Sequence, residues 1–240
     1  MGVRLQPRDE RILRHVARYR LSTPEVLHRL FFQPDGLSLE ASKSTLRRLW
    51  KDAESPFLDS KKLYGSGRDV YYHLTPHGAS YLGFTNPADI GHGFDKMDVR
   101  ARHLGCLLFA CGGEAPRPKF TVEEFQTCFP GALERGTDLY ARFFSDAYFF
   151  DERDGVRRLG RLLVDTGGDT TRVLQRAAET AVATLPRFVA AGRFTLAFVL
   201  PTAEKKRRVL QHLRQAPLDP PIPVFLDEQP GILPLLATAL

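Results

Sequence analysis

The side chains best suited to chemistry are hydroxyls and cations gathered on one short segment, residues 39–52. They are Ser42, Lys43, Ser44, Arg47, Arg48 and Lys51. Short hydroxyl side chains near the start of a helix let its backbone approach a DNA groove, and long cations beside them reach phosphates and guanine edges. An apolar stripe, Leu46, Leu49 and Trp50, would face a core and leave this set outward. The pattern predicts DNA contact; the alternative is a solvated face that serves protein contacts.

A second cationic group surrounds a predicted tight turn. Lys61, Lys62 and Arg68 flank the sequence Gly65-Ser66-Gly67, which joins two short runs with extended character at residues 57–63 and 69–74. Such a tip suits contact with phosphates or with the minor groove. Solubility alone is the competing explanation for these three side chains.

Thiol and imidazole groups do not form a recognisable metal motif. His103, Cys106 and Cys111 share one predicted helix, and Cys128 and His92 lie elsewhere. Zinc sites favour paired ligands two to four residues apart, and two such pairs are missing here. Phosphate-binding glycine loops, zinc-protease helices and nucleophile elbows are also missing. We therefore expect buried free thiols, no metal and no cofactor.

The elements that position the first two groups follow from periodicity and capping residues. Pro7 opens a helix with Ile12, Leu13 and Val16 on one face, and Ser22-Thr23-Pro24 starts a second. The third helix is the cationic segment, the hairpin follows, and Thr75-Pro76 starts a further turn through residue 82. Three helices and a two-stranded hairpin in about eighty residues are typical of a winged helix, the helix-turn-helix variant with a β-wing.

The rest of the chain alternates between helices and strands. After a linker at 83–93 we expect a helix at 94–111 and strands near 139–150, 161–165, 194–200 and 224–226. We also expect a long helix at 170–191, bent near Pro186, and a basic helix at 203–214. The predicted fold class is α+β, a winged helix followed by a small α/β domain. The predicted domains are 1–85 for DNA binding, 86–112 as linker and connecting helix, and 113–240 as the α/β domain.

Charge and composition agree with an anionic partner for the first part. The net charge is +6, and residues 1–86 hold fourteen Lys and Arg against nine Asp and Glu. Excess positive charge on one domain favours nucleic acid as the partner, although a few solvated arginines without a ligand would give the same excess. Neither a secretory signal nor an apolar membrane run is visible, so we expect a soluble cytoplasmic protein without membrane partners.

Several stretches carry a resemblance to a known family. They are PRDERIL at 7–13, RYRLST at 18–23, LRRL at 46–49 and YYHLTPHG at 71–78. On these, residues 7–84 resemble the N-terminal winged helix of the replication-relaxation family of bacterial plasmids and integrative elements. FFSDAYF at 143–149 and LLVDTG at 162–167 are similar to that family's C-terminal domain, which resembles the restriction-endonuclease fold.

The second resemblance raises the possibility of a nuclease. Enzymes of that fold use an Asp on one strand and an acid and a Lys on the next, so that the acids hold a divalent cation. Asp146 and Asp165 match the acids, but Gly167 stands where the Lys is expected, and Arg161 is the nearest strand cation. We therefore expect a non-catalytic domain for dimerisation or partner docking.

The combined prediction is a sequence-specific protein that binds double-stranded DNA, encoded by a plasmid or mobile element. The resemblance implies roles in replication, relaxation and transfer, or transcriptional control, with other proteins of the element as possible partners. One winged helix contacts few base pairs, so a homodimer is expected. The long helix from Thr170 and the tail 232–240 are the expected pairing surfaces. The alternatives are a metal-dependent DNA nuclease using Asp146 and Asp165, and a winged helix that binds protein.

Overall fold

Contacts in this computed structural model divide the chain into two units, Met1–Leu107 and Leu108–Thr238. The structure describes residues 4–51, 54–64, 69–84, 96–113, 117–130, 147–153 and 155–237. Both units combine helices with a small sheet, so the prediction of an α+β protein is confirmed. The division falls within one helix, α5 (Met97–Gly112), inside the segment that the sequence assigned to a linker and connecting helix.

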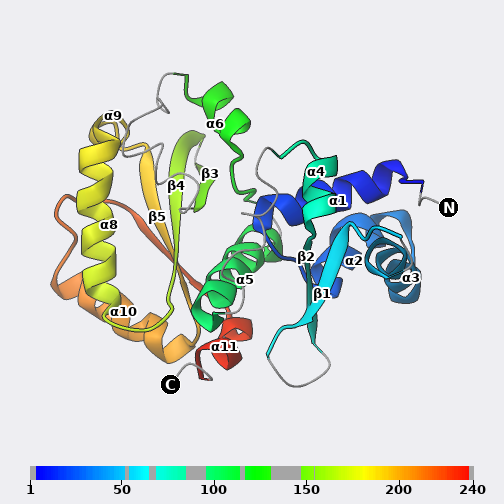
Figure 1. The fold of residues 1–240 in the computed structure, drawn as a ribbon. Coiled ribbons are helices and arrows are strands. Elements are labelled where there is room, and N and C mark those ends of the chain that lie inside the picture. Colours follow the sequence, from blue (N-terminus) through cyan, green and yellow to red (C-terminus); the bar gives the residue numbers. More distant parts are fainter. Residues whose placement is uncertain are drawn as a thin grey trace. The chain divides into compact units, whose positions relative to one another are not determined.

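Unit 1 begins with three helices in the order expected from the sequence (Figure 1). They are α1 (Pro7–Tyr19), α2 (Pro24–Phe31) and α3 (Leu39–Trp50), with a short 3₁₀ turn, η1 (Gln33–Asp35), before α3. The hydroxyl of Thr23 accepts a hydrogen bond from the backbone N–H of Val26, and Ser38 does the same for Ala41. These caps satisfy backbone donors that the first turn of a helix leaves without partners, which explains where α2 and α3 begin.

A two-stranded antiparallel hairpin follows the helices. It consists of β1 (Leu58–Lys62) and β2 (Val70–Leu74), paired in register from Leu58 opposite Leu74 to Lys62 opposite Val70. The predicted turn Gly65-Ser66-Gly67 and Arg68 lie outside the described residues. Ser22, in the α1–α2 connection, exchanges two backbone hydrogen bonds with Tyr72 of β2, which ties the hairpin to the helices.

The hairpin is closed by a short helix, α4 (Pro76–Tyr81), capped by Thr75. Gly78 is required in α4 because a Cβ atom there would lie 2.1 Å from the carbonyl oxygen of Phe57. The core of unit 1 joins all these elements through buried apolar side chains, among them Ile12, Leu27, Leu46 and Leu74. Burial of apolar surface stabilises this core, by about 25 cal/mol for each Å² removed from water.

Unit 2 is built on a four-stranded mixed sheet. The strands β3 (Ala147–Arg153), β4 (Val156–Val164), β5 (Phe194–Leu200) and β6 (Val224–Glu228) lie in sequence order. β3 and β4 form an antiparallel hairpin, and β4, β5 and β6 run parallel. The predicted strand at 161–165 was too short, because β4 begins at Val156, directly after Gly155, whose φ is +69°. The Asp154-Gly155 pair is the hairpin signal that would have shown this.

One face of the sheet is covered by α8 (Thr170–Thr184) and α10 (Ala203–Gln215), which connect the parallel strands (Figure 1). The helix predicted at 170–191, with a bend near Pro186, is two helices, because α9 (Pro186–Ala190) starts anew at that proline. Alternate residues of β5, such as Phe194 and Phe198, pack against Leu174 of α8 and its neighbours. Phe125 of α6 (Val122–Cys128) belongs to the same core.

The opposite face of the sheet is aromatic. Phe109, in the last turn of α5, lies 5.0 Å from the ring of Phe149 and 6.0 Å from that of Phe225. Gly160 must lack a side chain, because its Cβ atom would lie 2.2 Å from the Phe149 ring. The guanidinium of Arg117 stacks on Phe225, with its carbon 4.7 Å from the ring centroid.

The chain ends with η3 (Pro230–Ile232) and α11 (Leu233–Ala237). Ile232 and Leu235 are fully buried within this chain, so the expectation that the tail 232–240 offers a pairing surface is wrong for these two side chains. Among the described helices, none has both the length and the apolar character required to span a membrane.

Candidate nucleic-acid interface

The orientation of α3 is set by the side chains that it buries. Leu46 and Leu49 are fully buried in the core of unit 1. Ser42, one turn before Leu46, is fully buried as well, and its hydroxyl donates a hydrogen bond to the carbonyl oxygen of Leu39 at 2.6 Å. Residues 42, 46 and 49 therefore form the inner side of α3, and the opposite side faces solvent.

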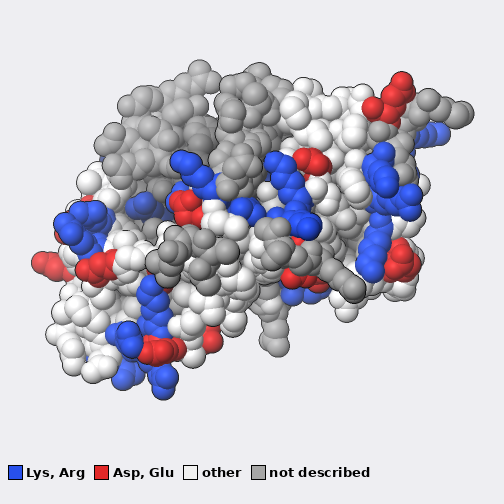
Figure 2. Space-filling model, turned by 60° about the horizontal axis from the view of Figure 1, so that its bottom comes forward, with Lys and Arg blue, Asp and Glu red and all other residues white. Residues whose placement is uncertain are grey.

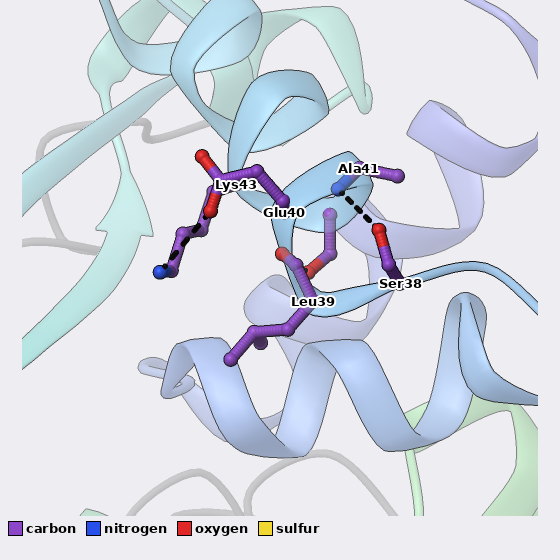
Figure 3. Close-up of polar contacts among 6 residues, drawn as sticks. Ser38, Leu39, Glu40, Ala41 and Lys43 are labelled. Atoms are coloured by element: carbon purple, nitrogen blue, oxygen red, sulfur yellow. Dashed lines mark hydrogen bonds and ion pairs between the residues drawn. The ribbon is translucent and has the colours of Figure 1, made fainter.

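Five side chains on that opposite side form a surface that we call the α3 outer face. They are Glu40, Lys43, Ser44, Arg47 and Lys51, and all are exposed. Their spacing of three or four residues aligns them along the helix. Figure 3 shows the start of this face, with Lys43 beside Glu40, and in Figure 2 basic side chains with acidic neighbours lie at the end of the view that holds α2 and α3.

The contacts that Lys43 and Lys51 make on the α3 outer face are weak. The Nζ of Lys43 lies 3.4 Å from Oε2 of Glu40, with both side chains more than half exposed. The Nζ of Lys51 lies 6.0 Å from the centre of the Trp50 ring. Exposed pairs of this kind contribute about 0–1 kcal/mol to folding, so they would yield readily to a ligand.

Two of the predicted contact residues on α3 have structural tasks. The prediction that Ser42 contacts DNA is wrong, because its hydroxyl is buried. Arg48 lies at the edge of the helix, where its Nη2 is 2.6 Å from Oδ2 of Asp9 and its Nη1 donates to the carbonyl oxygen of Arg4. The Asp9 side chain is 1% exposed. A cation that neutralises a buried carboxylate is held in place, so we assign Arg48 to positioning α3 against α1.

Asp9 also serves its own helix, a role that sequence reasoning missed. Its carboxylate accepts a hydrogen bond from the backbone N–H of Gln6 at 2.8 Å, and it belongs to the capping box that starts α1. The signal was available, since an acidic residue three positions after a helix start is typical of such a cap. No local sequence pattern predicts that the Asp9 carboxylate pairs with Arg48, which lies 39 residues away.

The cations of the hairpin are placed on both of its faces. Lys61 and Lys62 are exposed neighbours on β1, and consecutive side chains of a strand point to opposite faces. Arg100 of α5 donates hydrogen bonds to the carbonyl oxygens of Lys62 and Leu63, at 3.3 and 3.0 Å. The end of β1 is thereby fixed, and the side chains of Lys61 and Lys62 remain at the surface.

A partly buried polar contact connects α1 to the segment that pairs with β2. The Nε2 of His15 lies 3.1 Å from the hydroxyl of Ser22, and its ring packs 4.8 Å from that of Tyr19 and 5.4 Å from that of Phe31. Burial, with a smaller effect of the Arg18 charge, lowers the pKa of His15 to about 3. His15 is therefore neutral at physiological pH, and it joins α1 to the segment that pairs with β2.

The acids considered for metal chemistry in unit 2 are engaged in protein contacts. Asp165 follows β4 and is buried; its Oδ2 lies 2.5 Å from Nζ of Lys205 on α10, and its Oδ1 accepts the backbone N–H of Gly167. Lys205 of α10 thus lies beside Asp165, although the strand that leads to Asp165 contains no lysine. Asp146 lies outside the described residues.

Asp169 caps α8. Its Oδ1 accepts hydrogen bonds from the backbone of Thr171 and Arg172 and from the Thr171 hydroxyl, and the hydroxyl contact, first among several causes, lowers the pKa of Asp169. Among the described residues, no three His, Cys, Asp or Glu side chains are grouped to hold a metal ion. The thiols of Cys106 and Cys111 are buried, as predicted, whereas that of Cys128 is exposed.

No protein-family model, curated protein or solved structure matches this chain.

Proposed function

We propose that unit 1 is a winged helix that binds double-stranded DNA, with α3 in the major groove and the β1–β2 hairpin as the wing. The observation that carries the proposal is the α3 outer face. Lys43, Arg47 and Lys51 are aligned on the exposed side of a helix whose other side is anchored in the core. A helix in this setting can enter a groove about 12 Å wide without rearranging its unit.

The surroundings of α3 support the same function. Ser44 offers a short hydroxyl between the cations, and Lys61 and Lys62 on the hairpin add positive charge at a second place. Phosphate contacts from such lysines would orient the protein, while contacts from α3 to base edges would supply sequence preference. The excess of positive charge in residues 1–86 would speed encounter with DNA.

For the whole chain we propose a cytoplasmic DNA-binding protein of a plasmid or mobile element. Its roles would be replication, transfer or transcriptional control, as the family resemblance implies. Unit 2 would act without catalysis, in dimerisation or partner docking. Two copies on half-sites one helical turn apart would provide the specificity that a single winged helix lacks.

A double substitution on α3 tests DNA binding. Arg47→Ala with Lys51→Ala should weaken binding to a selected duplex by at least tenfold, because each lost phosphate or base contact costs about 1–3 kcal/mol. It should also reduce the slope of log affinity against log salt concentration. The measurement is fluorescence anisotropy at several salt concentrations, with the number of protomers per duplex read at saturation.

The matched control removes two exposed arginines from unit 2, Arg187→Ala with Arg193→Ala, and so changes the net charge equally. It should leave affinity within about twofold of the unsubstituted protein, a margin well below one lost contact. Equal weakening by both double variants would show a general charge effect and contradict the assignment of α3. Thermal unfolding must show that both variants fold.

A further inference from the structure

A carboxylate interrupts the cations of the α3 outer face. Glu40 is the single acidic residue of α3, and its side chain is 85% exposed, more than that of Lys43 at 54%. It lies in the first turn, beside Lys43 (Figure 3), and helical spacing places Ser44 and Arg47 on the same side. If this side approaches DNA, as proposed above, Glu40 brings a negative charge toward the phosphates.

The stabilisation that Glu40 gives to α3 is small. A carboxylate in the first turn of an exposed helix contributes about 0.3–1 kcal/mol through the helix dipole. The exposed pair with Lys43 adds about 0.2–0.5 kcal/mol. Ser38 already caps this helix through the N–H of Ala41. On a surface that meets phosphates, repulsion would offset these gains unless the carboxylate finds a hydrogen-bond donor.

The major groove offers such a donor mainly on one base. An ionised carboxylate only accepts hydrogen bonds. Guanine and thymine present acceptors in the groove, and adenine presents its amino group beside the acceptor N7. Cytosine presents its N4 amino group without a neighbouring acceptor on the same base. A carboxylate is therefore complementary to cytosine and is repelled by guanine and thymine.

Lys43 complements the other half of the same base pair. Its ammonium group only donates hydrogen bonds, and guanine presents the acceptors O6 and N7. Because Oε2 of Glu40 and Nζ of Lys43 are 3.4 Å apart, an acceptor and a donor lie side by side on the surface. A C·G pair presents a donor and an acceptor side by side in the groove.

We infer that Glu40 and Lys43 together read one C·G base pair, with Glu40 accepting from cytosine N4 and Lys43 donating to guanine. Glu40 is then a specificity-determining residue: it reduces affinity for DNA in general and restores it at a site with cytosine in the correct position. This inference depends on the proposed function, since it requires α3 to lie in the major groove.

The test compares base preference in the full-length protein and in Glu40→Gln. Duplexes retained from a randomised library by the unsubstituted protein should share a C·G pair in each half-site. Replacing that pair by T·A should weaken binding of the unsubstituted protein about tenfold, which lies within the range of about 1–3 kcal/mol for one base contact. The amide that this substitution introduces can donate as well as accept, so the variant should discriminate the two duplexes by less than threefold.

Glu25→Gln is the matched control. Glu25 is exposed and occupies the second position of α2, as Glu40 does in α3, so both substitutions remove the same charge from a first helical turn. The control should retain the tenfold preference. Lys43→Ala, the second variant, should lose the preference as Glu40→Gln does, with an added loss of affinity.

The outcomes separate the two proposals. If the unsubstituted protein retains no duplex in preference to others, the proposed sequence-specific function fails, and this inference fails with it. If it retains a defined site but Glu40→Gln selects the same bases with the same discrimination, the assignment of Glu40 is overturned and DNA binding stands. Uniformly tighter binding by Glu40→Gln, without a change of base preference, would show that Glu40 acts only as a surface charge and would also overturn its assignment.

Discussion

Asp9 and Arg48 show how single residues determine which part of α3 stays exposed. The pair joins the first turn of α1 to the last turn of α3, across 39 residues of sequence. Because Asp9 is almost completely buried, its charge requires a partner, and Arg48 is held to that task. Arg47, its neighbour, remains on the exposed side. Two adjacent arginines thus lie in different surroundings, one against a buried carboxylate and the other on the exposed side of α3.

Arg48→Ala should destabilise unit 1 on the order of 2 kcal/mol, since it leaves a buried carboxylate without its cation. The measurement is urea unfolding monitored by circular dichroism. In an Asp9→Asn background the same substitution should cost less than half as much, because no buried charge is left behind. An unchanged free energy of unfolding in Arg48→Ala would contradict the structural role. Arg47→Ala is the control and should cost less than Arg48→Ala, because the Arg47 side chain is exposed.

At the scale of elements, α1, the Ser22 segment and β2 are held together by polar contacts inside an apolar core. His15 bonds to Ser22, and the backbone of Ser22 pairs with Tyr72. Such a connection stabilises the unit only while the imidazole is neutral, because a charged ring would be desolvated in this position. The packing of α1 against the Ser22 segment therefore depends on a titratable group, the imidazole of His15.

The stability of unit 1 should fall as the pH is lowered from about 6.5 toward 3. The pKa of His15 is about 3 in the folded protein and near 6.5 when unfolded, so the unfolded chain binds the proton first in this range. Its contribution is fully present above pH 6.5, and at pH 5 about 2 kcal/mol of it should be lost.

The check is urea unfolding at pH 7 and pH 5. His15→Gln keeps a side chain able to bond to Ser22 but does not titrate, so its stability should depend less on pH. Burial also lowers the pKa of His73, which gives both proteins a residual slope of the same sign. The relevant quantity is the difference between the two slopes; equal slopes would refute the assignment to His15.

At the scale of the whole molecule, the acids of unit 2 bear on the alternative function, DNA cleavage. In unit 2, Asp165 and Lys205 form an ion pair between the end of β4 and the start of α10, and Asp169 caps α8. These contacts anchor helices to the ends of parallel strands. We propose that they leave neither Asp165 nor Asp169 available to organise an attacking water.

Supercoiled plasmid incubated with the protein and Mg²⁺ or Mn²⁺ should remain supercoiled on an agarose gel. Under the same conditions the protein should still retain its selected duplex. Metal-dependent nicking that disappears in Asp165→Asn, with DNA binding intact, would contradict a non-catalytic unit 2 and favour the nuclease function. The assay must show by thermal unfolding that Asp165→Asn is folded, since the substitution weakens the contact with Lys205.

The sequence alone determined the order of the elements in unit 1 and which faces of its helices are apolar. Proline and hydroxyl residues mark the starts of α1, α2 and α3, and the period of Ile12, Leu13 and Val16 predicts a buried side that the structure confirms. These are local properties, because a cap or a helical stripe depends on residues within one or two turns.

Only the tertiary structure decided which polar side chains are available. Ser42 was predicted as a contact residue but is buried, Arg48 is occupied by Asp9, and Lys205 reaches Asp165 from another element. The depressed pKa of His15 depends on burial among α1, α2 and the Ser22 segment. Partners that lie far apart in sequence, about forty residues in two of these cases, leave no periodic or spacing signal. Their effects on charge and exposure exist only once the chain has folded.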